Sequence, residues 1–258
     1  MTTALVTGAS AGIGRAFALG LAQRGYDVVL VARDEARITE LADTLRSAHR
    51  VQAHVLAADL LADAGLRAVE ARLRDAADPI ELLVNNAGMG TFGDFAATDI
   101  DAEEREIRLN VLALVRLAHA ALEAMVPRRS GAVLNISSLA GYQPAPSSAT
   151  YAATKAFVNS FSQSVHEECR PHGVHVMAVC PGYTHTEFHE RAGLGPTQIP
   201  DFMWQAADDV VAAALRDLDR RRVVSIPGTL NKVLGAASSV TPTAVTRRVA
   251  GIVMRRSG

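Results

Sequence analysis

A tyrosine and a lysine four residues apart, Tyr151 and Lys155, are well suited by type and spacing to acid–base chemistry. They lie in a stretch predicted to be helical, where a spacing of four puts both side chains on one face. A phenol has a pKa of about 10, and a neighbouring ammonium lowers it. The chain contains only two lysines, Lys155 and Lys232. We therefore predict a general acid–base that needs a compact ammonium at this position. The alternative is a chance pair on an ordinary helix.

A glycine-rich segment, "TGASAGIG" at 7–14, joins the first apolar run to the first helical stretch. Glycines there let the backbone turn tightly and approach a diphosphate, and the helix N-terminus offers free N–H groups. The spacing differs from the usual G-x-G-x-x-G, so an ordinary β–α turn is the alternative. The segment predicts a dinucleotide site.

The end of the second apolar run, "VLVARDE", bears on the choice of cofactor. NAD-preferring folds place an acid there for the ribose 2′-OH, whereas an arginine suits a 2′-phosphate. Ala32 stands at the acid's expected position, followed by Arg33 and then Asp34. The pattern favours NADP(H) over NAD(H). A solvent-exposed charge at a helix start is the alternative for Arg33.

Short apolar runs alternate with helix-length segments along the chain. The seven runs are "TALVTG", "YDVVLVAR", "VQAHVLAAD", "IELLVNNAG", "GAVLNISS", "VHVMAVCPG" and "RVVSIPG". In the first helical segment Ile13, Phe17 and Leu21 follow the helical period. The alternation predicts an α/β fold, a doubly wound, seven-stranded parallel sheet with helices on both faces, in one domain over 1–258. Residues 183–205 are predicted to form a substrate lid, and 229–258 a C-terminal helical tail.

Composition excludes several function classes. The net charge of −1 gives no imbalance that suggests a nucleic-acid partner. Two cysteines without a disulfide or zinc pattern predict a cytoplasmic protein, and the five histidines between residues 166 and 189 show no metal-site spacing. No secretory signal is recognised, and charged residues interrupt the longest apolar run, "NVLALVRLAHAALEAMV".

Six motifs in order resemble those of the short-chain dehydrogenase/reductase family. They are "TGASAGIG" at 7–14, "NNAG" at 85–88, Asn110, "NISS" at 135–138, "YAATK" at 151–155 and "PGYTHT" at 181–186. Together they span residues 7 to 186. The resemblance implies a Rossmann fold and an NAD(P)-dependent oxidoreductase that needs no metal.

The resemblance implies a role for each catalytic residue. Tyr151 would be the acid in reduction and the base in oxidation, and Lys155 would bind the nicotinamide ribose and lower the pKa of the tyrosine. Ser138, thirteen residues before the tyrosine, would hold the substrate oxygen in preference to Ser137. Asn110 would hold a water that links Lys155 to solvent. The alternative for Asn110 is a polar residue that bonds backbone inside a helix.

The resemblance also implies which residues hold the cofactor. Those at the phosphates are Gly8, Ser10, Ile13 and Gly14, with Arg33 at the 2′-phosphate. Those around the adenosine are Asp59, Leu60, Asn86, Ala87 and Gly88. Those at the nicotinamide are Tyr151, Lys155, Pro181, Gly182, Thr184 and Thr186. Thr184 is a departure, since the family usually has valine or isoleucine there.

Apolar and aromatic residues are predicted to rim the substrate pocket. They are Met89, Phe92, Phe95, Tyr142, Pro144, Phe188, Phe202, Met203 and Trp204. This rim favours a hydrophobic ketone or secondary alcohol, such as a lipid, a steroid or an acyl chain. The alternative is that half of these residues only pack the lid.

Two segments predict contacts with partners. The helical stretches "EIRLNVLALVRLAHAALEAM" and "YAATKAFVNSFSQSV" are apolar around much of their surface, and family members commonly pair them, which predicts a homodimer or homotetramer. The tail "TPTAVTRRVAGIVMRRSG" has the pattern of a basic amphipathic helix that contacts a membrane surface weakly. Packing on the body or on another subunit is favoured for it.

The sequence therefore predicts an NADP(H)-dependent carbonyl reductase or alcohol dehydrogenase. A catalytically silent NADP-binding regulatory or scaffold protein is the main alternative, and the intact set of Ser138, Tyr151 and Lys155 argues against it. An epimerase or dehydratase is a third possibility. Those enzymes usually add a larger C-terminal substrate domain, which this chain lacks.

Overall fold

The computed structural model describes residues 2–188, 192 and 200–240. Part of the predicted lid and the tail after residue 240, with its predicted membrane contact, lie outside these residues. The two ends of the lid are joined to each other. Thr184 and Gln205 form a parallel bridge, and the backbone N–H of His185 donates to the Gln205 carbonyl at 2.9 Å.

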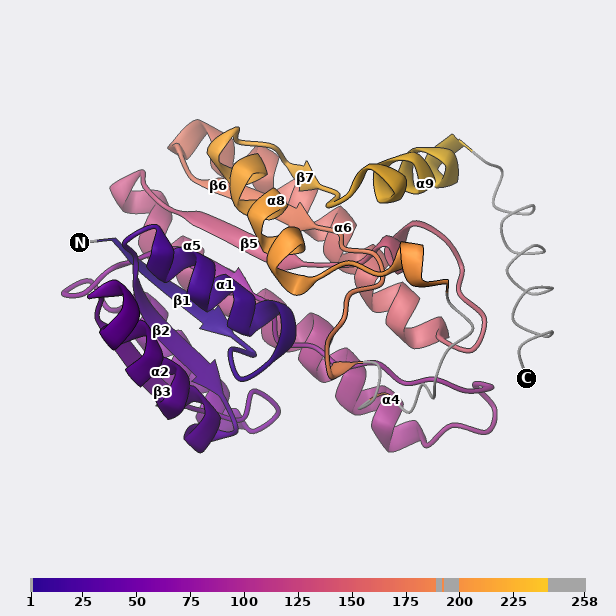
Figure 1. The fold of residues 1–258 in the computed structure, drawn as a ribbon, viewed down its shortest axis with the longest axis horizontal. Helices are drawn as coiled ribbons and strands as arrows, with labels where there is room; N and C mark the ends of the chain where they lie inside the picture. Colours follow the sequence, from indigo (N-terminus) through magenta and orange to yellow (C-terminus); the bar gives the residue numbers. More distant parts are fainter. Residues whose placement is uncertain (1, 189–191, 193–199, 241–258) are drawn as a thin grey trace.

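Seven parallel strands form one sheet in the order β3-β2-β1-β4-β5-β6-β7 (Figure 1). The strands are β1 (Thr3–Thr7), β2 (Asp27–Ala32), β3 (Ala53–Ala57), β4 (Ile80–Asn85), β5 (Ala132–Ile136), β6 (His175–Val179) and β7 (Val224–Ser225). The order confirms the predicted doubly wound sheet. The direction of winding reverses between β1 and β4, and open α/β sheets bind ligands at such a point.

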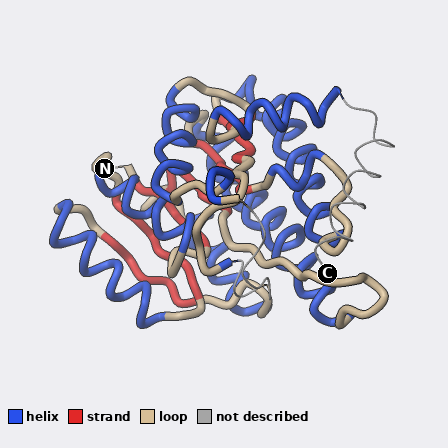
Figure 2. Tube along the Cα trace, turned by 45° about the vertical axis from the view of Figure 1, so that its right-hand side comes forward, coloured by secondary structure: helices blue, strands red, loops and turns tan. Residues whose placement is uncertain are grey.

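Helices cover both faces of the sheet (Figures 1 and 2). On one face lie α1 (Gly12–Gln23), α2 (Glu35–His49) and α8 (Ala207–Asp219). On the other lie α3 (Asp63–Arg74), α5 (Leu114–Arg128) and α6 (Ala149–Cys169). The remaining helices are α4 (Ile100–Ile107), η1 (Arg108–Ala113), η2 (Leu139–Tyr142), η3 (Arg170–His172), η4 (Asp201–Met203) and α9 (Thr229–Val240).

The two faces of the sheet bury separate apolar cores. Along β1, Ala4 and Val6 pack with the core of α1, α2 and α8, whereas Leu5 packs with the core of α3, α5 and α6. Successive strand residues point to opposite faces, so a strand covered on both faces needs a continuous apolar run. The predicted stripe of α1 agrees, because Phe17 and Leu21 are fully buried.

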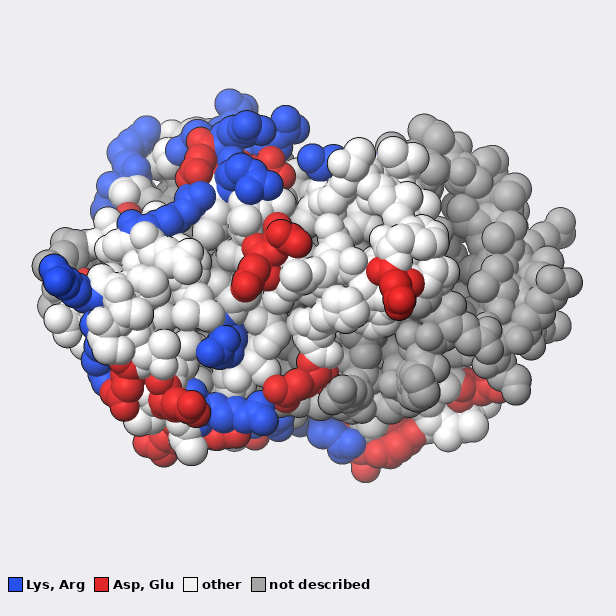
Figure 3. Space-filling model, viewed as in Figure 1, with Lys and Arg blue, Asp and Glu red and all other residues white. Residues whose placement is uncertain are grey.

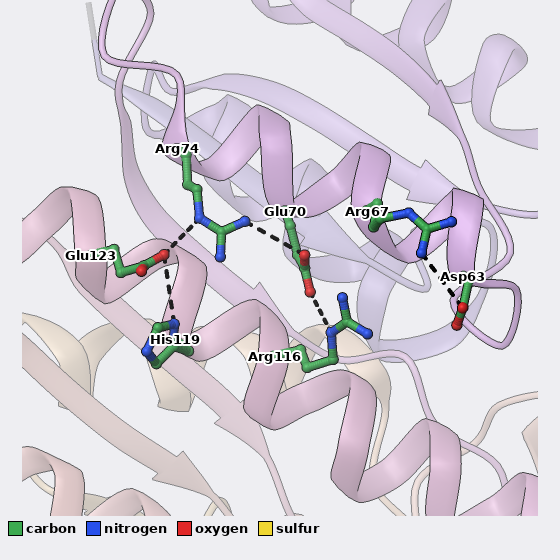
Figure 4. Close-up of polar contacts among 7 residues, drawn as sticks. All are labelled: Asp63, Arg67, Glu70, Arg74, Arg116, His119 and Glu123. Atoms are coloured by element: carbon green, nitrogen blue, oxygen red, sulfur yellow. Dashed lines mark hydrogen bonds and ion pairs between the residues drawn. The ribbon is translucent and has the colours of Figure 1, made fainter.

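An ionic chain joins α3 to α5 on the second face (Figure 4). Arg116 Nε lies 2.5 Å from Glu70 Oε1, and Arg74 Nε lies 2.6 Å from Glu123 Oε2. The Arg116 hydrogen bond holds the pKa of the mostly buried Glu70 carboxyl below its ordinary value. His119 Nδ1 lies 3.6 Å from the same oxygen of Glu123. These ion pairs connect two helices whose apolar residues already share one core.

Charges on the face in Figure 3 are distributed unevenly. Basic side chains gather at its upper edge. Acidic side chains lie mainly along its lower edge, and few of the described residues at its centre are charged. This face carries no continuous basic surface among the described residues.

Within the described part of the chain, one helical run is long and apolar enough in composition to cross a membrane, Ile100–Arg128. It consists of α4, η1 and α5, and 44% of its most apolar stretch is buried inside the protein. A helix of a protein core passes the same test of length and composition. The buried apolar residues of α5 belong to the core that packs on the sheet and on α3.

A buried histidine at the start of β6 predicts how stability depends on pH. His175 Nε2 donates to the Arg222 carbonyl at 3.0 Å, and Nδ1 has no hydrogen-bond partner among the described residues. Burial, with smaller contributions from the neighbouring His166 and Arg221, lowers the pKa of His175 from 6.5 to about 4. Protonation would place an unsatisfied N–H and a charge in the core.

We therefore expect the stability that neutral His175 provides to be present above about pH 6.5 and lost as the pH falls towards 4. The free energy of unfolding should fall by about 2 kcal/mol between about pH 7.5 and about pH 5 from this group. Urea denaturation of the wild type and of His175→Gln measures it, since glutamine keeps the N–H donor but does not titrate. An equal pH dependence in both proteins would contradict the assignment.

Candidate active site

The carboxyl ends of β1 and β4 are tied together at the point where the sheet reverses. The Thr7 hydroxyl accepts the backbone N–H groups of Asn86 at 2.9 Å and Ala87 at 3.0 Å. Asn86 Nδ2 donates back to the carbonyls of Thr7 at 2.9 Å and Gly8 at 3.3 Å. The "TGASAGIG" and "NNAG" motifs, far apart in sequence, therefore meet and stiffen each other.

The glycine turn leaves a cradle that side chains would fill. Gly8 has a φ of +66° and Gly12 one of +53°, in the left-handed region that favours glycine. A Cβ on Gly14 would lie 2.2 Å from the Gly8 carbonyl oxygen and 2.4 Å from Asn86 Nδ2. Ala11, at the start of α1, makes no side-chain cap, so the first N–H groups of the helix have no side-chain acceptor from it. These features fit the phosphates of a dinucleotide.

The segment after β6 closes the other side of the cradle. A Cβ on Gly12 would lie 2.9 Å from Thr186 Cγ2. A Cβ on Gly182 would lie 2.6 Å from the amide of Asn231, a buried residue of α9. Thr184 is also buried, and its hydroxyl donates to the Gly182 carbonyl at 3.0 Å. The hydroxyl shapes this loop, which is how the chain accommodates threonine at 184.

The end of β2 presents a positive charge. Arg33 is exposed, and within the described residues no ion pair engages it. The Asp34 carboxylate instead caps α2, accepting the N–H of Arg37 at 3.1 Å. Asp34 is thus used by the helix. Of the two predicted adenine neighbours, Asp59 is exposed and the side chain of Leu60 is buried in the core.

Three of the predicted catalytic residues come from the N-terminus of η2 and from α6. Lys155 Nζ lies 5.6 Å from the centroid of the Tyr151 ring and donates to the Ile136 carbonyl at 2.9 Å. The Ser137 hydroxyl donates to the Lys155 carbonyl at 2.9 Å, which fixes α6 to the end of β5. Ser138 begins η2, and its Oγ accepts the Ala140 N–H at 3.1 Å. Ser137 and Ser138 therefore serve different contacts.

Burial dominates the ionisation of this site. The pKa of Tyr151 is raised to about 12, and burial is the largest cause. A hydrogen bond with Ser138 opposes this rise, whereas Glu106 and Tyr183 add to it. Burial likewise lowers the pKa of Lys155, and with the opposing effect of Glu106 included the pKa is about 8. The resemblance implied a lowered pKa for Tyr151. In the protein alone the pKa is raised, because removing the phenolate from water outweighs the nearby charges.

Asn110 lies in a π-helical turn, η1, that interrupts the long helix between α4 and α5. Its Nδ2 donates to the Met89 carbonyl at 2.8 Å and to the Thr154 hydroxyl at 3.2 Å, and its Oδ1 accepts the Met89 N–H at 2.9 Å. Such turns often occur at functional sites. The side-chain amide thus clamps the segment after β4, and the predicted water relay stays a prediction.

Aromatic rings surround the tyrosine. The centroids of Phe188 and Phe92 lie 5.5 Å and 6.3 Å from that of Tyr151. A Cβ on Gly90 would lie 3.0 Å from Phe188 and 3.3 Å from both Phe92 and Tyr151. A cavity of about 410 Å³ opens beside this segment. Phe95 and Phe202, also predicted at the rim, are 60% and 74% exposed.

Sequence reasoning missed several residues around the site. Glu103 and Glu106 are buried beside the segment after β4, although glutamates on a helix ordinarily indicate a solvent face. Arg37 of α2 pairs with Glu187 of the lid at 3.0 Å, and Asn231 supports Gly182. No local sequence pattern predicts these contacts. The described residues contain no group of three or more His, Cys, Asp or Glu side chains placed to hold a metal ion.

Known proteins resemble this chain over most of its length. The profile of a family described as "short chain dehydrogenase" matches residues 2–195. A short-chain dehydrogenase from Sphingobium yanoikuyae, solved in complex with NADPH, is 41% identical, with a TM-score of 0.85 over 95% of this chain and 98% of that one.

Two further relatives carry names that mention a substrate. A "bulky-bulky ketone specific alcohol dehydrogenase" from Comamonas testosteroni is 35% identical, with a TM-score of 0.80 over 95% of this chain and 96% of that one. The very-long-chain 3-oxoacyl-CoA reductase of Rattus norvegicus is 31% identical over 248 residues, 90% of this chain and 75% of its own.

Proposed function

Because the chain belongs to the short-chain dehydrogenase/reductase family, we propose that it is an NADP(H)-dependent carbonyl reductase or alcohol dehydrogenase that acts on a hydrophobic ketone or secondary alcohol. The observation that carries the proposal is that Ser138, Tyr151 and Lys155 lie together, with Lys155 next to Gly88 and with aromatic rings against Tyr151. Such a site can move a proton at the same carbonyl group that a nicotinamide reduces.

The residues divide the chemistry between them. The nicotinamide, when bound, supplies or accepts the hydride. The Ser138 hydroxyl holds the substrate oxygen, and Tyr151 gives its proton to that oxygen in reduction and takes it back in oxidation. A phenol with a pKa of about 12 is protonated at neutral pH, the state that reduction needs. The Lys155 ammonium stabilises the phenolate that remains.

The aromatic wall supports a bulky apolar substrate. Phe92 and Phe188 flank the phenol, and Gly90, which has no side chain, packs against all three rings. An apolar group can therefore lie beside the reacting carbonyl. Two relatives bear names that refer to a bulky ketone and to a very-long-chain acyl thioester. A substrate of this class fits the same wall.

The test follows the absorbance of NADPH with a panel of carbonyl compounds. Aryl ketones, steroid ketones and long-chain 3-oxoacyl thioesters should be reduced with a higher kcat/KM than short aliphatic ketones of equal reactivity. Turnover confined to small polar aldehydes would overturn the proposed substrate class. NADPH binding without turnover on any carbonyl would favour the silent binding protein instead.

Arg33 predicts the choice between the two nicotinamide cofactors. Its exposed guanidinium at the end of β2 suits a 2′-phosphate, and no acid competes for the ribose because Asp34 caps α2. We expect Arg33→Ala to raise the KM for NADPH by about 10- to 100-fold and to leave that for NADH almost unchanged. Initial rates with both cofactors measure this, and Arg50→Ala is a control at an exposed arginine after α2. Equal effects on both cofactors would remove the role of Arg33.

Exposed apolar side chains on neighbouring helices support a homodimer or homotetramer. Ile107 of α4, Leu112 of η1 and Phe157 of α6 are each more than two-fifths exposed, at 44%, 53% and 41%. Light scattering at micromolar concentration should give a mass of two or four chains, and Leu112→Glu should lower it. A monomer in the wild type would contradict the proposal. A cytoplasmic location and a tail that contacts membrane weakly remain proposals.

A further inference from the structure

Helix α9, which follows β7 (Figure 1), buries an asparagine and exposes larger apolar side chains. Asn231 is 5% exposed, whereas Leu230 and Val233 are 41% and 61% exposed. An amphipathic helix ordinarily does the reverse, and burying an amide is costly unless hydrogen bonds satisfy it. The contacts that Asn231 makes should therefore explain why this side of α9 faces the protein.

Both hydrogens of the Asn231 amide are used. Nδ2 donates to Gln205 Oε1 at 2.7 Å and to the Pro227 carbonyl at 2.9 Å. An amide NH₂ group has two hydrogens, so these two bonds use its full donor capacity. The first bond joins α9 to the end of the lid, and the second joins it to the segment after β7. An apolar side chain at this position could make neither bond.

Gln205 extends this contact to the loop after β6. Its backbone N–H donates to the Tyr183 carbonyl at 2.9 Å, and its carbonyl accepts the His185 N–H at 2.9 Å. A Cβ on Gly228 would overlap Gln205 Nε2, so the glycine leaves room for the glutamine side chain. The bonded amides of Asn231 and Gln205, here called the amide clamp, therefore hold this loop to α9.

The Asn231 amide also packs on the backbone of the same loop. A Cβ on Gly182 would lie 2.6 Å from both Nδ2 and Oδ1 of Asn231, which is too close for any side chain at residue 182. Glycine thus lets the amide approach the backbone. The position of the backbone at Gly182 therefore depends on the position of Asn231.

The loop that the amide clamp holds runs between the phosphate cradle and the catalytic serine. At one end, a Cβ on Gly12 would lie 2.9 Å from Thr186 Cγ2. At the other end, the N–H of Leu139, the residue after Ser138, donates to the Pro181 carbonyl at 2.9 Å. A dinucleotide with its diphosphate at the glycine turn and its reactive ring near Ser138 would therefore lie along this loop.

We propose that Asn231 and Gln205 are positioning residues that fix the loop of residues 181–186 where it meets the nicotinamide. The proposal rests on the proposed function, because it takes the ligand to be NADP(H). Both side chains act through the backbone of the loop and need not touch the reacting atoms. Loss of the amide clamp should therefore weaken binding of the nicotinamide half of the cofactor and spare the adenosine half.

The test compares NADPH with 2′,5′-ADP, which contains the adenosine and the 2′-phosphate but lacks the nicotinamide. Asn231→Ala removes the amide and remains compatible with a helix. By calorimetry its Kd for NADPH should rise by about 5- to 20-fold, whereas its Kd for 2′,5′-ADP should stay within about twofold of the wild type. Val233→Ala, at an exposed residue of the same helix, is the matched control and should bind both ligands normally.

Equal weakening of both ligands would show that Asn231 supports the fold as a whole, and unchanged NADPH binding would show that the loop keeps its place without the clamp. Either result would overturn the proposal. Calorimetry needs no turnover, so these outcomes do not depend on whether the protein reduces a carbonyl. A wild type that binds neither ligand would overturn the proposed function and this proposal together.

A second variant covers the case in which Asn231→Ala does not fold. Gln205→Leu removes the acceptor of Asn231 Nδ2 and keeps the backbone bonds of residue 205 to Tyr183 and His185. It should show the same selective loss of NADPH binding. The double variant should bind NADPH no more weakly than Asn231→Ala alone, because both substitutions break the same bond. Additive losses would contradict the amide clamp.

The single tryptophan of the chain gives a readout of the clamp without any ligand. Trp204 precedes Gln205, and the centroid of its ring lies 4.8 Å from that of His185 and 5.6 Å from that of Tyr183. If the amide clamp holds this loop, the fluorescence emission of Asn231→Ala should shift to longer wavelength, because the loop moves and water reaches the ring. The emission of Val233→Ala should match the wild type. An unshifted emission in Asn231→Ala would count against the proposal.

Discussion

Replacing Tyr151 with phenylalanine is expected to lower kcat for carbonyl reduction by about 10²- to 10⁴-fold, the range that general acid catalysis contributes. The change removes only the phenol oxygen, so the ring contacts with Phe92 and Phe188 remain and the fold should be unaffected. Water is a poor substitute for the phenol as the acid, because the rings of Phe92 and Phe188 lie against the position of the phenol and leave it little access to solvent. Initial rates with NADPH and the best ketone of the panel measure the loss.

NADPH binding separates a chemical effect from a binding effect. The Kd for NADPH of Tyr151→Phe, from fluorescence titration, should stay within about threefold of the wild type. Tyr26→Phe is the matched control, since Tyr26 precedes β2 and packs on the core of α1 and α2. Near-normal turnover in Tyr151→Phe would show that another group supplies the proton and would remove the central role proposed for Tyr151.

Replacing Gly14 with alanine is expected to abolish measurable NADPH binding and to destabilise the protein. The new Cβ would lie 2.2 Å from the Gly8 oxygen and 2.4 Å from Asn86 Nδ2, far inside contact distance. Relief requires the turn to move away from Asn86, which breaks the tie between the ends of β1 and β4. Overpacking of this kind costs about 1–3 kcal/mol, and the distorted turn no longer fits a diphosphate. Fluorescence titration with NADPH and urea denaturation measure the two effects.

The same helix offers a control for the glycine substitution. A Cβ on Gly20 would meet only the side chains of Val211 and Leu215, at 3.2 Å and 3.4 Å. Gly20→Ala should therefore bind NADPH normally, with stability changed by about 1 kcal/mol or less. If Gly14→Ala bound NADPH as well as Gly20→Ala, the turn would not hold the diphosphate.

Local sequence patterns predicted most of the fold. The alternation of apolar runs with helical segments predicts seven strands, and the sheet contains seven in a doubly wound order. Continuous apolar runs arise because each strand is covered on both faces, so the same residues that form the core mark the elements. The spacing of Tyr151 and Lys155 is also a local signal, because residues four apart in a helix lie on the same face.

Other features of the site have no local signature. Asp34 could bind a ribose or cap a helix, and only the fold shows that it caps α2. Phe95 and Phe202 were predicted at the pocket rim from their aromatic type, and only the structure shows that most of each side chain is exposed. Arg37 and Glu187 meet although 150 residues separate them.

The sequence by itself determined the order of the elements and the residue types that do the chemistry, because both follow from short-range periodicity and spacing. The tertiary structure decided the environment of those residues. It removed the Tyr151 hydroxyl from water so that its pKa rises to about 12, and it brought Glu103 and Glu106 to the same threonine, Thr91. Burial and charge pairing depend on which distant segments exclude water from a group, and that is fixed only when the chain packs.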